Sequence, residues 1–154
     1  MTDQGKAEPV RQRVTSPEEA AYACLLQTAD VLARGVEKLL KTADISRTQY
    51  NVLRILRGAL PGLPCREIAD RMITRDPDIT RLLDRLEKSG LITRCRENKD
   101  RRVVLTRITD EGLRLLERLD APVMELHQKQ LRHLGRERLP ALVALLELAR
   151  QSAE

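Results

Sequence analysis

The sequence predicts a mainly α-helical chain with one small β-hairpin, and three observations lead to this expectation. Hydrophobic residues make up 42% of the chain but include no Phe or Trp, so the core has to be built from Leu, Val, Ile and Ala, which interdigitate between helices. Apolar residues recur at helical spacing over most of the chain, whereas the segment after Gly90 is rich in β-branched residues. The length of 154 residues fits one domain.

The first predicted helix begins at Ser16, which precedes Pro17 and two glutamates in the pattern of a helix N-cap. Residues 1–15 mix charged residues with Gly and Pro, and we expect a mobile arm there. Such a helix can pack through a seam of residues at alternating spacings of four and three, most simply against the same surface of a second subunit. The seam consists of Ala21, Leu25, Thr28, Leu32, Gly35 and Leu39.

The second predicted helix covers residues 47–57. Ser46 and Gln49 have the spacing of a capping box, in which each side chain bonds to the other residue's backbone amide. Ile45 and Tyr50 stand on either side of this box and are placed to form a hydrophobic staple.

Two further helices complete a predicted helix-turn-helix. A short helix over 65–72 is followed by a turn of three or four residues. We expect Asp76 to be the next N-cap and Pro77 the first residue of a helix over 77–89, which Gly90 ends.

The helix over 77–89 has two different faces. Its apolar stripe should pack on the core and is formed by Ile79, Leu82, Leu83 and Leu86. Its other face should point outward and carries Thr80, Arg81, Asp84, Arg85 and Lys88.

A β-hairpin follows, with strands over 91–96 and 103–108 and a basic tip over 97–102. Thr109 is the expected N-cap of a long helix that ends near Gly135. The last helix, 137–151, is too apolar to be solvated, so we expect it to bury against the first helix of both subunits.

These elements predict a winged helix-turn-helix domain over 46–108. A helical dimerisation region is expected from both chain ends, 16–45 and 109–152.

The winged helix-turn-helix segment also carries most of the net charge. Between Cys65 and Arg107 there are twelve Lys and Arg against eight Asp and Glu, a net charge of +4 out of +5 for the chain. A helix-turn-helix followed by a basic hairpin suits duplex DNA, because the outward helix face can enter the major groove and the tip can reach the minor groove. The candidate DNA-binding residues are Asp78, Thr80, Arg81, Arg85, Lys99, Arg101 and Arg102.

Each candidate suits a particular contact. Arg81 and Arg85 can bind guanine through two hydrogen bonds or clamp phosphates, and Thr80 can contact a phosphate or a thymine methyl group. Asp78 either interacts with the helix dipole or accepts a hydrogen bond from a cytosine amino group.

From about Glu18 to Gln151 the chain resembles the MarR family of winged-helix transcription regulators. The run DPDITRLLDRLEKSGLITR is similar to the family's recognition helix and first wing strand, and KDRRVVLTRITDEG is similar to the second half of the wing. Within this second run, Asp100 and Arg102 match the family's D-x-R pattern.

The resemblance implies roles that the residue patterns alone do not. Asp100 is expected to orient the wing through ion pairing, Arg102 to be the minor-groove arginine, and Thr80 and Arg81 to lie where the family meets DNA. A homodimer, a pseudo-palindromic operator and repression relieved by a small ligand or an oxidant are also implied. Our candidates for lining a ligand crevice are Tyr22, Tyr50 and Leu63.

Several other functions are not expected. No phosphate-binding loop or nucleophile motif is found, so we predict no enzyme and no cofactor. His127 and His133 are six positions apart, which does not suit a shared metal, and we predict no metal site. No apolar run approaches the roughly 18 residues of a membrane span and no signal peptide is evident, so a cytoplasmic protein is expected.

Two alternatives remain open. The winged helix could serve as a protein-interaction module, although its predicted outward face carries polar residues instead of the apolar anchors that such a module uses. A redox-sensing repressor is a further variant, with Cys24, Cys65 or Cys95 as the thiol; we expect Cys24 to be an inert residue at a helical core position. A site for single-stranded nucleic acid is not favoured, because the stacking aromatics are missing.

Overall fold

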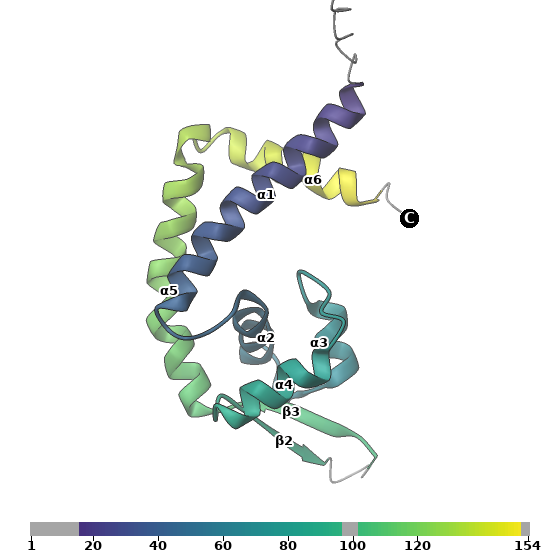
Figure 1. The fold of residues 1–154 in the computed structure, drawn as a ribbon, viewed down its shortest axis with the longest axis vertical. Coiled ribbons are helices and arrows are strands. Elements are labelled where there is room, and N and C mark those ends of the chain that lie inside the picture. The colour runs from purple at the N-terminus through teal and green to yellow at the C-terminus, as the bar shows by residue number, and fades with distance from the viewer. Residues whose placement is uncertain (1–15, 97–101, 152–154) are drawn as a thin grey trace, which may run out of the picture.

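A computed structural model describes residues 16–96 and 102–151. It is mainly helical with a small three-stranded antiparallel sheet, which confirms the predicted fold class (Figure 1). The mobile arm predicted for residues 1–15 lies outside the described residues, as do residues 97–101 of the predicted wing tip. The elements are α1 (Pro17–Lys41), α2 (Arg47–Arg57), β1 (Leu63–Pro64), α3 (Cys65–Arg71), α4 (Ile79–Lys88), β2 (Ile92–Arg96), β3 (Val104–Ile108), α5 (Asp110–Leu131), a 3₁₀ turn (Arg132–Leu134) and α6 (Arg138–Gln151).

Side-chain caps fix the starts of three helices where the sequence predicts them. Ser16 Oγ accepts a hydrogen bond from the Glu19 amide at 3.1 Å, at the start of α1. Ser46 and Gln49 form both bonds of a capping box at the start of α2. Thr109 Oγ1 accepts from the amide of Gly112 at 3.1 Å and begins α5. Each cap satisfies amide groups that the helix itself leaves without partners.

The start of α4 differs from the prediction. Its N-cap is Asp78 and not Asp76, because Asp78 Oδ1 accepts a hydrogen bond from the amide of Arg81 at 3.2 Å. Asp76 instead accepts from the Asp78 amide at 2.9 Å, within the preceding turn. The helix therefore covers Ile79–Lys88 instead of 77–89, and the turn before it has seven residues, from Met72 to Asp78, instead of three or four.

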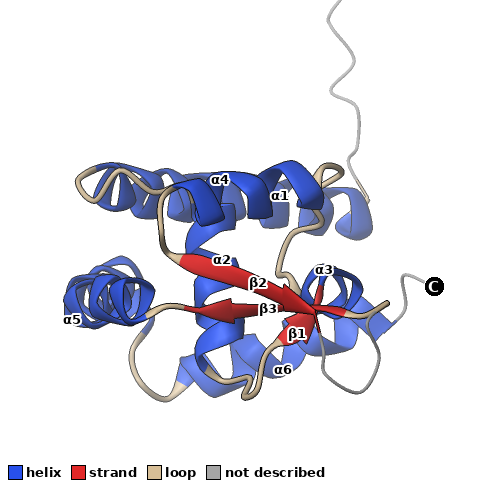
Figure 2. Ribbon diagram, turned by 90° about the horizontal axis from the view of Figure 1, so that it is seen from below, coloured by secondary structure: helices blue, strands red, loops and turns tan. Residues whose placement is uncertain are grey.

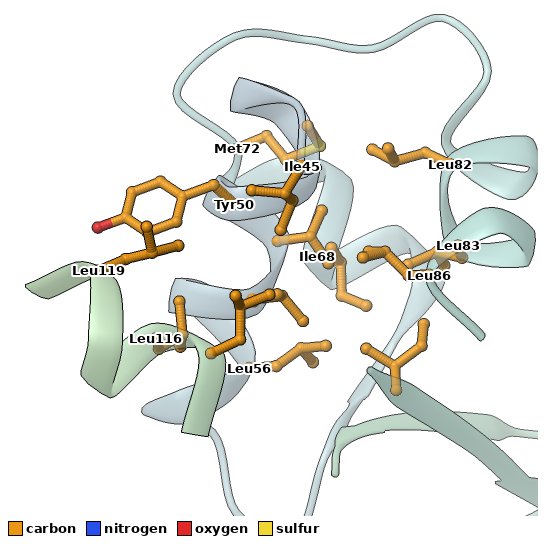
Figure 3. Packing of buried hydrophobic residues seen from close by; sticks show 14 of the residues in the cluster. Ile45, Tyr50, Leu56, Ile68, Met72, Leu82, Leu83, Leu86, Leu116 and Leu119 are labelled. Atoms are coloured by element: carbon orange, nitrogen blue, oxygen red, sulfur yellow. The ribbon is translucent and has the colours of Figure 1, made fainter. Parts of the chain in front are cut away.

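The core lies where α2, α3, α4 and α5 converge (Figure 3). Leu82, Leu83 and Leu86 of α4 are buried in it, as the apolar stripe predicts, and Ile79 is half-buried against it. Burial of one such side chain contributes about 1.5 to 3 kcal/mol. This stripe fixes which face of α4 points outward.

The three strands pair in the order β1, β3, β2, and Figure 2 shows them side by side. The hairpin of β2 and β3 has the predicted limits to within one residue, but β1, with only two residues, was not predicted. Gly62 allows β1 to approach β3: its φ is +130°, and an added Cβ would lie 2.8 Å from the carbonyl oxygen of Thr106.

Helix α5 begins directly on the hairpin. Thr109 Oγ1 donates a hydrogen bond to the carbonyl oxygen of Gly90 at 2.7 Å, and the Thr109 amide donates to that of Leu91 at 3.1 Å. Gly112 is buried at this junction, where a Cβ would collide with the carbonyl oxygen of Leu91. The hairpin and the long helix are thus joined through their backbones.

Helix α1 packs on α5 only through its C-terminal half. Gln130 Nε2 donates to the carbonyl oxygen of Leu32 at 3.0 Å, and Gly35 leaves room for this side chain. This part of the predicted seam therefore packs within the chain. The N-terminal half of α1 is exposed, and α6 has no buried residue.

Cys24 lies in the exposed half of α1, so the expectation that it occupies a core position is wrong for this chain. Helical spacing places it beside Ala and Leu, but those neighbours are themselves uncovered. Cys65 and Cys95 are half-buried.

Candidate nucleic-acid interface

The outward face of α4 is polar and positively charged. Thr80, Arg81 and Arg85 are exposed there, as predicted, and so is Lys88. Arg85 and Lys88 form no ion pair with any residue in the described part of the chain. Their charges therefore face solvent and are available to a polyanion.

Asp78 contacts Arg81 at the start of this face. Besides capping the Arg81 amide, its carboxylate lies 3.6 Å from Arg81 Nε. Both side chains are exposed, so the ion pair is weak and can be exchanged for a phosphate contact. Of the two predicted roles for Asp78, the structure contains the one at the helix N-terminus.

Arg94 of β2 joins the hairpin to α4 and was not among the predicted site residues. Its Nη2 lies 2.6 Å from Asp84 Oδ1, and its Nε donates to Glu87 Oε2 at 2.9 Å. The Arg94 backbone amide also donates to Glu87 Oε1, at 3.1 Å. Asp84 and Glu87 are three positions apart on α4, so one guanidinium can bind both.

This ionic contact engages both carboxylates of α4. Hydrogen bonding from Arg94 lowers the pKa of Glu87 below its usual 4.5, so this carboxylate stays ionised at neutral pH. The hydrogen bonds that Arg94 donates, first to Glu87 and then to Asp84, raise the pKa of Arg94. The single positive charge of Arg94 therefore offsets one of the two negative charges of α4 that would otherwise repel phosphate.

The predicted wing tip is described only in part. Lys99, Asp100 and Arg101 lie outside the described residues. Arg102 is exposed and stands just before β3. Further along the hairpin, Arg96 and Arg107 are exposed on β2 and β3, so arginine side chains continue beyond the tip.

A pocket of about 180 Å³ lies between α2 and the turn before α4. Of the three residues suggested for a ligand crevice, Tyr50 lines this pocket, whereas Tyr22 is exposed on α1 and Leu63 is buried in β1 against Thr106. The fold therefore does not bring these two residues to this pocket. The lining consists of Val36, Arg47, Thr48, Tyr50, Asn51, Arg54, Ile73, Thr74 and His127.

Charges and an aromatic ring meet in this pocket. The guanidinium carbon of Arg54 lies 5.9 Å from the centre of the Tyr50 ring. Burial raises the pKa of the Tyr50 hydroxyl, which stays protonated at neutral pH. Arg47 is paired with Glu37 at 3.3 Å.

Two exclusions can be stated for residues 16–96 and 102–151. No group of three or more His, Cys, Asp or Glu side chains is arranged there to hold a metal ion. None of the helices in these ranges is both long enough and apolar enough to cross a membrane.

Comparison with known proteins places this geometry among related regulators. The model of the MarR family matches residues 45–104. The transcriptional regulator FarR of Neisseria gonorrhoeae is 34% identical over 127 residues, which are 82% of this chain and 86% of FarR.

Solved structures of MarR-family proteins are also similar to this chain. A MarR transcription factor from Planctomyces limnophilus is 42% identical with a TM-score of 0.67, over 88% of this chain and 99% of that one. MepR of S. aureus, solved as a complex with DNA, is 25% identical with a TM-score of 0.76, over 85% of this chain and 97% of MepR.

The contact between Arg94 and α4 predicts a pH-dependent stability. Because the folded-state pKa of Glu87 is lowered, the stabilisation is fully present above pH 4.5 and is lost as the pH falls through the lower folded-state value. We expect Arg94→Met to lower the thermal midpoint by roughly 2 to 4 °C at pH 7, and the difference from wild type to shrink towards pH 3.5. Circular dichroism melts at several pH values measure this.

Arg114→Met is the matched control, because Arg114 pairs with Glu111 within one helix and is largely exposed. Its effect on the midpoint should be smaller than that of Arg94→Met. An Arg94→Met difference that stays constant down to pH 3.5 would show that ionised carboxylates do not hold Arg94.

Proposed function

Because the chain belongs to the MarR family, whose members are transcription regulators and not enzymes, we propose that it binds a pseudo-palindromic operator in double-stranded DNA as a homodimer. The observation that carries this proposal is the exposed cationic face of α4, held beside a β-hairpin by Arg94. In this arrangement α4 enters the major groove and the hairpin reaches the neighbouring minor groove.

The contacts divide between the two grooves. Arg81 and Arg85 bind guanine or phosphate, and Thr80 contacts phosphate or a thymine methyl group. Arg102 enters the minor groove, with Lys99 and Arg101 on nearby phosphates and Asp100 orienting the wing. Asp78 acts mainly as the cap that sets the start of α4.

Uncovered apolar side chains support the homodimer. Tyr22, Leu26 and Val31 are exposed on α1, and Leu145 and Leu148 on α6. Monomeric proteins rarely leave large apolar patches open, so these side chains favour a partner that covers them. A partner subunit that covers these helices places the two α4 helices about one turn of DNA, roughly 10 bp, apart or a multiple of it.

We also propose that the protein represses transcription and that a small ligand in the pocket beside α2 relieves repression. Such a ligand weakens DNA binding only if it prefers the subunit arrangement in which the α4 helices are misaligned. This function implies a cytoplasmic location, because the protein has to reach the DNA.

The protein-interaction alternative receives no support from α4. None of the large exposed apolar side chains in the described part of the chain lies on this helix. An interaction module would need such anchors.

Selection from a random duplex library tests DNA reading by α4. The wild-type protein should enrich an inverted repeat whose half-sites are about one turn apart. Arg85→Ala should bind the selected duplex roughly tenfold to a hundredfold more weakly, because one arginine contact to a base or phosphate is lost. Affinity should fall steeply with salt.

Arg118→Ala serves as the control, since Arg118 is an exposed arginine on α5, away from α4 and the hairpin. It should bind like wild type. Equal affinities of the Arg85 and Arg118 variants, or no enriched repeat, would contradict DNA reading by α4.

Sedimentation equilibrium tests the homodimer. Leu145→Glu puts a charge on a side chain of α6 that is 65% exposed in the single chain. If α6 is covered by a partner, the buried carboxylate should raise the dissociation constant of the dimer at least about a hundredfold, which corresponds to several kcal/mol. Leu60→Glu, at an exposed leucine between α2 and β1, should leave the dimer intact. A dimer unaffected by Leu145→Glu would place the interface elsewhere.

A further inference from the structure

One side chain of α2 holds the turn that leads into α4. Asn51 Oδ1 accepts a hydrogen bond from the backbone amide of Ile73 at 2.9 Å. Asn51 is half-buried, between the buried residues Tyr50 and Val52. Its position is thus set by the core, while its bonding partner belongs to the segment from Met72 to Asp78.

Met72 anchors the start of this turn by its burial in the core, and the remaining residues are held mainly by local hydrogen bonds. The Met72 amide donates to the Ala69 carbonyl at its beginning, and the Asp78 amide donates to Asp76 at its end. The side chain of Ile73 is 84% exposed and anchors nothing. Among the hydrogen bonds of the described residues, the one from Ile73 to Asn51 links the turn's backbone to an element other than α3 and α4, the two helices that the turn connects.

This turn determines where α4, the helix proposed to contact DNA, begins. Asp78, at its end, caps the amide of Arg81, and Thr80 and Arg81 stand in the first turn of α4. In this first turn only the half-buried Ile79 packs on the core, and the fully buried leucines begin at Leu82, so the core fixes the first turn less firmly than the rest of α4. A movement of the turn therefore displaces the residues proposed to touch DNA.

The same hydrogen bond borders the pocket. Asn51, Ile73 and Thr74 are part of its lining, together with Val36 of α1 and His127 of α5. The pocket thus brings together the helical region of the chain, α2 and the turn. Any molecule seated there lies against the residues that make this bond.

We propose that Asn51 is a positioning residue for DNA binding: by holding the Ile73 amide it fixes the first turn of α4, and it is the point at which pocket occupancy reaches that helix. This inference rests on the proposed function. It does not require Asn51 to touch DNA.

Hydrogen exchange and duplex binding test it together. In Asn51→Ala, the Ile73 amide should exchange at least about tenfold faster than in wild type, whereas the Leu83 amide in the buried part of α4 stays protected. The variant should bind the library-selected duplex about fivefold to tenfold more weakly, as expected for one lost hydrogen bond, with a nearly unchanged thermal midpoint. Asn51→Asp keeps an acceptor oxygen and should restore slow exchange at Ile73.

Thr48→Ala is the matched control, because Thr48 also lines the pocket from α2 but bonds to Ser46 and not to the turn. It should leave both exchange at Ile73 and duplex affinity unchanged. Unaltered exchange in Asn51→Ala would overturn the hydrogen bond as the anchor, and faster exchange with unaltered affinity would overturn its role in positioning α4. If the wild-type protein binds no duplex, the proposed function fails instead, and the exchange data still report on the anchor.

Discussion

The ionic contact between Arg94 and the two carboxylates of α4 is the interaction on which the rest of the interface depends. The leucine stripe of α4 fixes which face points outward, but apolar packing alone is not directional. Arg94 adds hydrogen bonds with defined geometry, to Asp84 and Glu87, from a strand of the hairpin. The helix and the wing therefore form one unit, and the same contact offsets part of the negative charge of the helix.

Besides the packing of α4 in the core and the pairing of β1 with β3, two hydrogen-bonded contacts connect this unit to the remainder of the chain. The hairpin continues into α5 through Thr109 and the close approach of Gly112 to Leu91. The start of α4 is tied to α2 through Asn51. Because α5 packs on α1 near Gly35, a change in the angle of the long helices reaches the hairpin through backbone contacts. These connections give a physical route by which subunit arrangement can control the spacing of two recognition helices.

The sequence predicted what short-range chemistry decides. Caps such as Ser16, the capping box at Ser46 and the stripe of α4 depend on residues within four positions of one another, and all are confirmed. The N-cap of α4 was misplaced because Asp76 and Asp78 both suit the role, and only the turn's path selects between them. Arg94 and the strand β1 were not predicted, and of the residues that line the pocket only Tyr50 was named. Each of these features depends on partners that folding brings together.

The central claim is that α4 reads the major groove while the attached hairpin reaches the minor groove, once in each subunit. Methylation interference on a selected duplex tests it most directly, since dimethyl sulfate modifies guanine N7 in the major groove and adenine N3 in the minor groove. We predict interference at guanine N7 in two tracts about one helical turn apart, or a multiple of it, with interference at adenine N3 beside each tract. Binding that is indifferent to guanine N7, or that depends on a single tract, would contradict the account.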